Sequence, residues 1–288
     1  MQARFDEERN IQWARALERA GVHVVYGLSG LKTHAKLALV VRREGDMVRR
    51  YVHIGTGNYN PSTARLYTDL GLFTCREDLV EDVADLFNHL TGFGRPPRYR
   101  KALVAPSHLR DGALAEIERA IEGHTAESPS RVVMKMNAII DGPVIEAIYR
   151  ASQAGVRVDL IVRGIAGLRP GVPGVSDSVR VISIVGRFLE HARIFAFTVG
   201  GETRYWIGSA DMMARNLDNR VELTTPVEDE IAAREIQAVL DIQLADTALA
   251  WELGADGSWR RVRPEPGEEP LDSQVALMER AAGAGRAT

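Results

Sequence analysis

The chain has 288 residues, of which 45% are hydrophobic and 26% are charged, and its formal net charge is −3 at pH 7. This is the balance of an ordinary globular protein with enough residues for two cores, and any site for a polyanion must be local. A single cysteine, Cys75, excludes an internal disulfide framework, and no apolar run approaches the length of a membrane span. We therefore expect a cytoplasmic protein without an integral membrane segment.

The N-terminal stretch predicts a helix followed by a strand. The apolar residues of ARFDEERNIQWARALERAG, residues 3–21, fall on one helical face, and its last residue, Gly21, is a typical helix stop. The next segment, HVVYG at 23–27, predicts a strand. An α/β domain usually begins with a strand and none precedes this helix, so we expect the chain to be the C-terminal part of a longer protein.

A hairpin, a helix and a boundary follow. The segments HAKLALVV and MVRRYVHI predict a hairpin over residues 33–54, with its turn at Gly45 and Asp46. A helical pattern occupies 77–90. The stretch GFGRPPRYRK at 92–101 is rich in Gly, Pro and Arg, which is typical of a boundary between domains.

Beyond this boundary, helical and strand patterns alternate. Helices expected at 107–122 and 141–154 alternate with the strands VVMKMN and VRVDLIVRG, which favours a mostly parallel or mixed sheet covered by helices. Two more strands are expected within 181–209, and an amphipathic helix within 227–247. The expected division is a first domain at 1–101, a second at 102–264, and a polar tail with a short helix at 265–288.

Three segments of the first half recur in the second half in the same order. The pairs are AGVHVVYG with AGVRVDLIVRG, THAKLALV with EHARIFAF, and YVHIGTGNYN with RYWIGSADMMARN. One such pair can arise by chance, but three in register indicate a duplicated domain.

Each copy carries a histidine two positions before a cation. Residues i and i+2 of a strand point to the same face, so His34 lies beside Lys36 and His191 beside Arg193. A neutral imidazole next to a fixed cation can act as a nucleophile toward an anion. The Gly-containing loops that follow add polar groups for ligand contact, namely Thr56, Asn58, Ser209 and Asn216. Two such sets around one cleft predict phosphoryl chemistry, in which the cations offset charge on the phosphate oxygens.

This arrangement resembles the phospholipase D superfamily, in which paired His-x-Lys motifs bracket a phosphoryl group. Two features depart from that pattern: no acidic residue follows either motif in HAKLALVV or HARIFAFT, and Arg193 replaces the second lysine. Within the superfamily, the chain resembles the catalytic half of the polyphosphate kinase 1 family. The segments that carry this resemblance are THAKLALV, HIGTGNYNPSTARLYTDLGLFT, LIVRGIAGLRPGV, ISIVGRFLEHARI and IGSADMMARNLDNRVELTTP.

The resemblance implies two similar α/β domains, the first truncated at its N-terminus, and a role for particular residues. It implies that His34 receives the phosphoryl group of ATP and passes it to a growing polyphosphate chain, while His191 assists. Tyr67 and Arg163, with His191, correspond to the family's ATP site. Arg4 corresponds to a residue of its magnesium site, where a guanidinium can contact only the phosphates, because it cannot ligate a cation.

The same resemblance implies Mg²⁺ as cofactor, ATP or ADP and inorganic polyphosphate as ligands, no nucleic acid partner, and a homo-oligomer in the full-length form. We expect the fragment alone to fold, to bind ATP weakly and to make no polymer. Two alternatives stay open, a phospholipase D-like phosphodiesterase and a polyanion-binding fragment without turnover.

Several residues also have simpler interpretations. His191 could be positional, Lys36 and Arg193 could be solvated charges at strand ends, and Tyr67 could serve core packing. Cys75 is expected to be a small core residue. No partner pattern accompanies the remaining histidines, which are His23, His53, His89, His108 and His124.

Overall fold

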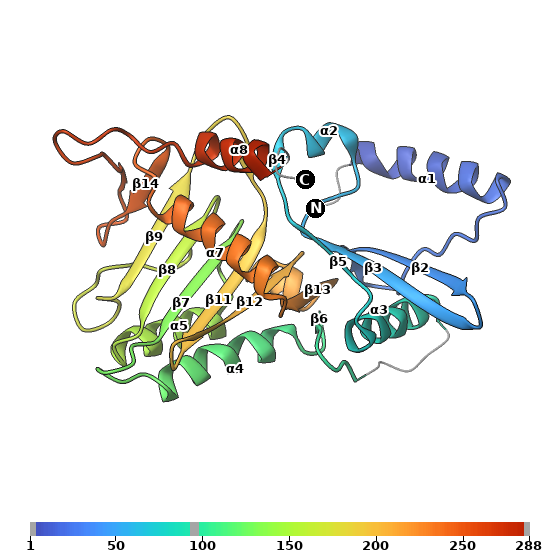
Figure 1. Cartoon of the computed structure of the whole chain (residues 1–288), viewed down its shortest axis with the longest axis horizontal. Helices are drawn as coiled ribbons and strands as arrows, with labels where there is room; N and C mark the ends of the chain where they lie inside the picture. The colour runs from blue at the N-terminus through green and yellow to red at the C-terminus, as the bar shows by residue number, and fades with distance from the viewer. Residues whose placement is uncertain (1–3, 93–97, 285–288) are drawn as a thin grey trace.

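The computed structural model describes residues 4–92 and 98–284, and the side chains of 11–92 and 98–283. Two halves of different size lie side by side (Figure 1). The N-terminal half holds a three-stranded sheet, whereas the C-terminal half holds most of a ten-stranded mixed sheet flanked by helices. The predicted α/β class with a mixed sheet and flanking helices is confirmed.

The first half packs one face of its antiparallel sheet, in the order β2-β3-β5, against helix α3. Val52 and Ile54 of β3 and Val83 and Leu86 of α3 form the centre of this small core. The elements are α1 (Arg4–Arg19), β1 (Lys32–Thr33), β2 (Lys36–Glu44), β3 (Met47–Gly55), α2 (Pro61–Ala64), β4 (Tyr67–Thr68), β5 (Gly71–Thr74) and α3 (Glu77–Leu90).

The second half is a layered structure in which both faces of the sheet are covered. Helices α4 and α5 cover one face and α7 and α8 lie over the other (Figure 1). The elements are β6 (Leu103–Ala105), α4 (Leu109–Glu122), β7 (Arg131–Met136), α5 (Gly142–Gln153), β8 (Arg157–Val162), β9 (Val179–Ile184), β10 (Leu189–Glu190), β11 (Arg193–Val199), β12 (Glu202–Gly208), α6 (Ala214–Leu217), β13 (Arg220–Val227), α7 (Glu230–Leu244), β14 (Ala250–Leu253), β15 (Trp259–Arg261) and α8 (Ser273–Ala284).

The main path of the large sheet runs β1-β13-β12-β11-β7-β8-β9-β14-β15, and β6 also pairs with β13. Strands β7, β8 and β9 are parallel, while β11, β12 and β13 are antiparallel. Ligands of open α/β sheets bind beyond the carboxyl ends of parallel strands, so the loops after β7 and β8 are natural site positions.

The duplication is visible in the topology of the two halves. Strands β2, β3 and β5, with α2 before the third strand and α3 after it, match β11, β12 and β13 with α6 and α7. The second copy also has the parallel strands β7, β8 and β9, which give it a much larger core.

Two local predictions are wrong. Residues 22–27 are irregular rather than a strand, because no strand of the described residues lies beside HVVYG to pair with its backbone. Its counterpart in the second copy, β8, lies between β7 and β9. Cys75 is exposed rather than in the core, because it follows the edge strand β5, and Arg49 Nη2 donates to its Sγ over 3.4 Å.

Exposed apolar side chains concentrate on α1 and the segment after it. Trp13 is 63% and Tyr26 75% exposed. Figure 1 shows α1 at the far end of the first half. An open sheet edge or an unpaired helix face is expected near residues 4–27, and the side chains described for α1 are mostly exposed. No helix of the described residues combines the length and apolarity needed to cross a bilayer.

Candidate functional site

Two short parallel pairings connect the halves and place both histidines. Strand β1, which ends just before His34, pairs with β13 of the second half, and the amide of His34 donates to the carbonyl of Val221 over 2.9 Å. Strand β10, which ends just before His191, pairs with β4 of the first half. Each histidine therefore lies against a strand that the opposite half supplies.

His34 is held by a glutamate of the second half. Its Nδ1 lies 2.8 Å from Oε2 of Glu222, a fully buried carboxylate. Ser209 donates to the same oxygen of Glu222, and Nδ2 of Asn216 donates to the other oxygen over 2.7 Å. Because a carboxylate accepts, Nδ1 donates, and the lone pair of the imidazole is left on Nε2.

His191 is held in the same way by an aspartate of the first half. Its Nδ1 lies 2.8 Å from Oδ1 of Asp69, which also accepts from Oγ1 of Thr56 over 2.7 Å. The ring of Tyr67 lies against His191, with 4.9 Å between the ring centroids. A Cβ on Gly57 would lie 2.0 Å from a carboxylate oxygen of Asp69, so this loop position has no room for a side chain.

The two carboxylates are thus exchanged between the copies. Asp69 and Thr56 belong to the first copy and serve His191, while Glu222 and Ser209 belong to the second copy and serve His34. Neither acid lies in a His-x-(Lys/Arg) motif, so the motifs alone do not reveal them. The side chains of Thr56, Ser209 and Asn216, which are predicted as ligand contacts, are buried and donate hydrogen bonds to the two acids. Asn58 is exposed in its loop.

Each cation approaches the backbone of its own histidine. Lys36 Nζ donates to the carbonyl of His34 over 2.5 Å, and Arg193 Nη1 donates to the carbonyl of His191 over 2.6 Å. The copies differ in the next contact, because Arg193 also donates Nε and Nη2 to the two oxygens of Asp211, each over 3.2 Å. Asn58 stands at the equivalent position of the first copy, so Lys36 has no carboxylate on its own loop.

Burial disfavours the charged form of both imidazoles. Burial lowers the pKa of both His34 and His191, although the hydrogen bonds that they donate to Glu222 and Asp69 act in the opposite direction. Burial also lowers the pKa of Lys36 to about 7, against the attraction of Glu222 and with repulsion from Arg193 of the other copy. Charges from both copies therefore affect Lys36.

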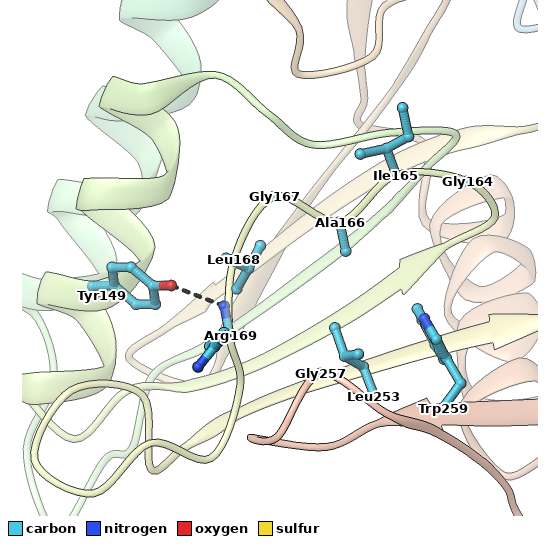
Figure 2. Close-up of a pocket in the computed structure, with 10 residues that line it drawn as sticks. All are labelled: Tyr149, Gly164, Ile165, Ala166, Gly167, Leu168, Arg169, Leu253, Gly257 and Trp259. Carbon is cyan, nitrogen blue, oxygen red and sulfur yellow. Dashed lines mark hydrogen bonds between the residues drawn. The ribbon is translucent and has the colours of Figure 1, made fainter.

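Arg163 lies directly after β8, where the parallel strands end. Its Nε donates to Oδ1 of Asn137 over 2.8 Å, its Nη2 donates to the same oxygen, and its buried Nη1 has no partner among the described residues. The loop that follows, residues 164–169, lines a cavity of about 490 Å³, and Arg169 N donates to the hydroxyl of Tyr149 over 2.9 Å (Figure 2). In Figure 2, Trp259 of β15 lines the same cavity opposite this loop.

Magnesium has no preformed cluster of protein ligands among the described residues. They contain no group of three His, Cys, Asp or Glu side chains that could hold a metal ion. The carboxylates nearest to the histidines, Asp69 and Glu222, are occupied by hydrogen bonds. The predicted contact of Arg4 cannot be located, because that side chain lies outside the described part of the chain.

The motifs of this duplicated α/β fold, with one histidine and one cation from each copy, resemble those of the phospholipase D superfamily. The chain belongs to the polyphosphate kinase family. The family model "Polyphosphate kinase C-terminal domain 2" matches residues 102–274, and "Polyphosphate kinase C-terminal domain 1" matches residues 1–96.

Individual relatives agree with this assignment. A polyphosphate kinase of Thermosynechococcus vestitus is 59% identical over 280 residues, and one of Mycolicibacterium gilvum is 55% identical over 280 residues. Both alignments cover 97% of this chain but only 38% of the relative. The crystal structure of polyphosphate kinase from Porphyromonas gingivalis superimposes with a TM-score of 0.91 at 38% identity, covering 100% of this chain and 44% of that one. The chain therefore spans about two fifths of the length of these relatives.

Proposed function

We propose that this chain forms the catalytic part of an ATP–polyphosphate phosphotransferase, which moves the terminal phosphate of ATP reversibly to a growing inorganic polyphosphate chain. Family membership supports the reaction class. The observation that supports a phosphohistidine intermediate is the His34–Glu222 pair, in which a 2.8 Å contact at Nδ1 leaves Nε2 free as a nucleophile.

In the first half-reaction, Nε2 of His34 attacks the γ-phosphorus of ATP. The N–P bond forms, the bond to the bridging β,γ-oxygen breaks, and ADP leaves. The imidazole gains positive charge in this step, and the carboxylate of Glu222 stabilises that charge through the hydrogen bond from Nδ1.

In the second half-reaction, a terminal oxygen of polyphosphate attacks the phosphorus on His34. The N–P bond breaks, and the imidazole returns to its neutral state with the polymer one phosphate longer. The reverse sequence returns the phosphate to ADP. Lys36 is the cation suited to offset charge on the transferred group, because it has no carboxylate on its own loop.

The second histidine is proposed to assist at the phosphates. Asp69 fixes its Nδ1 over 2.8 Å, so Nε2 can accept a proton and, once protonated, donate to a phosphate oxygen. Tyr67, which contacts the His191 ring, and Arg163, with its unpartnered buried Nη1, are proposed as contacts of ATP, and Asn58 as an exposed contact in the first loop. Mg²⁺ is proposed as cofactor from family membership alone, and no step is assigned to it.

The decisive experiment is incubation of the full-length gene product, and of residues 1–288, with γ-labelled ATP. We expect an acid-labile, base-stable label on His34 in the full-length product, chased into polymer when polyphosphate is added. Binding of polyphosphate without a label on any residue would leave only a polyanion-binding protein. Cleavage of phosphodiester substrates without dependence on ATP would replace the proposal by a phospholipase D-like hydrolase.

A further inference from the structure

Asn137 connects two cations of the site. It directly follows β7, and its Oδ1 accepts from Arg163 Nε over 2.8 Å and also from Arg163 Nη2. Its backbone amide donates to Oδ1 of Asp211 over 2.8 Å, and its Nδ2 lies 3.5 Å from the other oxygen of Asp211. One residue therefore contacts both the guanidinium of Arg163 and the carboxylate that holds Arg193.

The backbone around Asn137 fixes this arrangement. The amide of Gly164 donates to the Asn137 carbonyl over 2.8 Å, which ties the end of β8 to the end of β7. A Cβ on Gly164 would approach that carbonyl oxygen to 3.0 Å, so the two loops lie in close contact. Asp211, the carboxylate that links Asn137 to Arg193, is 3% exposed and therefore buried.

The chemistry of the two arginines differs because of their partners. Asp211 is a carboxylate and offsets the charge of Arg193. Asn137 is an amide and orients Arg163 without removing its charge. Two of the three guanidinium nitrogens of Arg163 donate to Asn137, and the third, Nη1, is buried without a partner among the described residues.

We propose that Asn137 is a positioning residue for ATP binding. Its side-chain oxygen orients the guanidinium of Arg163 so that Nη1 faces a phosphate oxygen of ATP. Its contacts with Asp211 hold Asn137 in place relative to the loop that carries Asp211. This inference rests on the proposed function of Arg163 as a phosphate contact. It adds a residue that does not itself touch the phosphates.

Two substitutions separate orientation from charge. Asn137→Ala removes the acceptor, so the guanidinium of Arg163 is free to leave its position. Asn137→Asp keeps an acceptor for Arg163 but neutralises it and places a like charge beside Asp211. Both should weaken ATP binding, and Asn88→Ala, on the exposed face of α3, is the matched control.

The test is a double-mutant cycle with Arg163→Ala, measured as kcat and KM for ATP in the full-length gene product. We expect Asn137→Ala to raise KM about tenfold, the scale of one charged hydrogen bond, with kcat within about threefold of wild type. Because Asn137 acts through Arg163, the double variant should match Arg163→Ala alone. Additive effects, or an unchanged KM in Asn137→Ala where Arg163→Ala raises it, would overturn the inference.

A second measurement does not depend on activity. The Nε–H resonance of Arg163 should be protected from solvent exchange in wild type and in the Asn88→Ala control, and should lose protection in Asn137→Ala. Retained protection would contradict the inference whatever the kinetics show. The Asn137→Asp variant should retain protection, because it keeps an acceptor for Arg163. If Asn137→Ala does not fold, the KM for ATP of Asn137→Asp is measured in its place. An Arg163→Ala variant with unchanged KM would instead refute the proposed contact between Arg163 and ATP.

Discussion

Glu222 and His34 are separated by 188 residues in the sequence and by 2.8 Å in the structure. The reciprocal pair, Asp69 and His191, spans 122 residues with the same 2.8 Å contact. Both pairs cross between the duplicated halves. Each imidazole is therefore oriented by an acid of the opposite half, and this contact exists only when both halves are folded together.

The first prediction concerns the charge of Glu222. Glu222→Gln keeps an acceptor for Nδ1 of His34 but removes the negative charge that stabilises the phosphorylated imidazole. We expect the rate of His34 labelling by γ-labelled ATP to fall roughly 10²- to 10⁴-fold, the range for groups that act on proton position. Rapid-quench measurement of the label gives this rate directly.

Glu228→Gln is the matched control, because Glu228 is a partly exposed carboxylate that pairs with Lys101 and Arg76 outside the histidine site. It should label at the wild-type rate. Equal labelling in Glu222→Gln and Glu228→Gln would show that His34 does not depend on its acid.

The second prediction separates the two histidines. His34→Ala should abolish the covalent label and polymer synthesis together. His191→Ala and Asp69→Asn should both slow turnover while permitting some labelling of His34, because they alter the assisting imidazole and its acid. The measurements are single-turnover labelling and steady-state polymer synthesis. If His191→Ala lost the label and His34→Ala kept it, the assigned roles would have to be exchanged.

The third prediction is a pH dependence that comes from Lys36. Burial lowers the pKa of its ammonium to about 7, so the cation is present below that pH and is lost as the pH rises through it. If the charged form binds phosphate oxygens, kcat/KM for ATP should fall by up to about tenfold for each pH unit above 7.

Lys36→Arg tests this assignment, because a guanidinium stays charged throughout that range. The variant should lose the alkaline fall in kcat/KM, whatever its absolute rate. A wild-type profile that is flat between pH 7 and 9 would exclude Lys36 as a titrating phosphate contact.

The fourth prediction concerns a buried ion pair next to the site. Lys135 Nζ lies 2.8 Å from Glu190, and both side chains are almost fully buried. Thr68, Gln243 and Gln274 donate to the same carboxylate, so Glu190 joins β4, α7 and α8 just before His191. Lys135→Met should cost about 3–5 kcal/mol in the free energy of unfolding, because it leaves Glu190 buried and unpaired.

Urea unfolding measures this loss. The double variant Lys135→Met with Glu190→Gln should recover most of it, since neither charge is then buried alone. Lys101→Met, which breaks an exposed pair with Glu228, should change stability by less than about 1 kcal/mol. Equal losses in Lys135→Met and Lys101→Met would contradict the argument.

Much of the fold could be predicted because it follows local patterns. The period of apolar residues places α3 at 77–90 as observed, and the Gly45 turn fixes the β2–β3 hairpin. The segment HVVYG has the same local pattern as β8, yet it is not a strand, because strand formation requires a neighbour that local sequence does not supply. The short β14–β15 hairpin was not predicted.

The same distinction between local and long-range features applies to the site. His34, Lys36, His191 and Arg193 could be found because each motif is contiguous and repeated. The acids could not be found from the motifs, since they come from the opposite copy. One signal was present in the sequence: Asp69 follows Thr56 by 13 positions, and Glu222 follows Ser209 by 13 positions. This shared spacing marks both acids once the structure shows what they bind.

The exchange of acids also sets an order of events during synthesis. His34 is translated 188 residues before Glu222, which corresponds to roughly 10–40 s at about 5–20 residues per second. During that interval, the imidazole lacks its carboxylate, and β1 lacks β13 as its neighbour. A nascent chain that has completed only its first half therefore contains the proposed nucleophile without the means to orient it. We expect histidine phosphorylation to begin only after the second half has folded against the first, so a truncated translation product would not consume ATP.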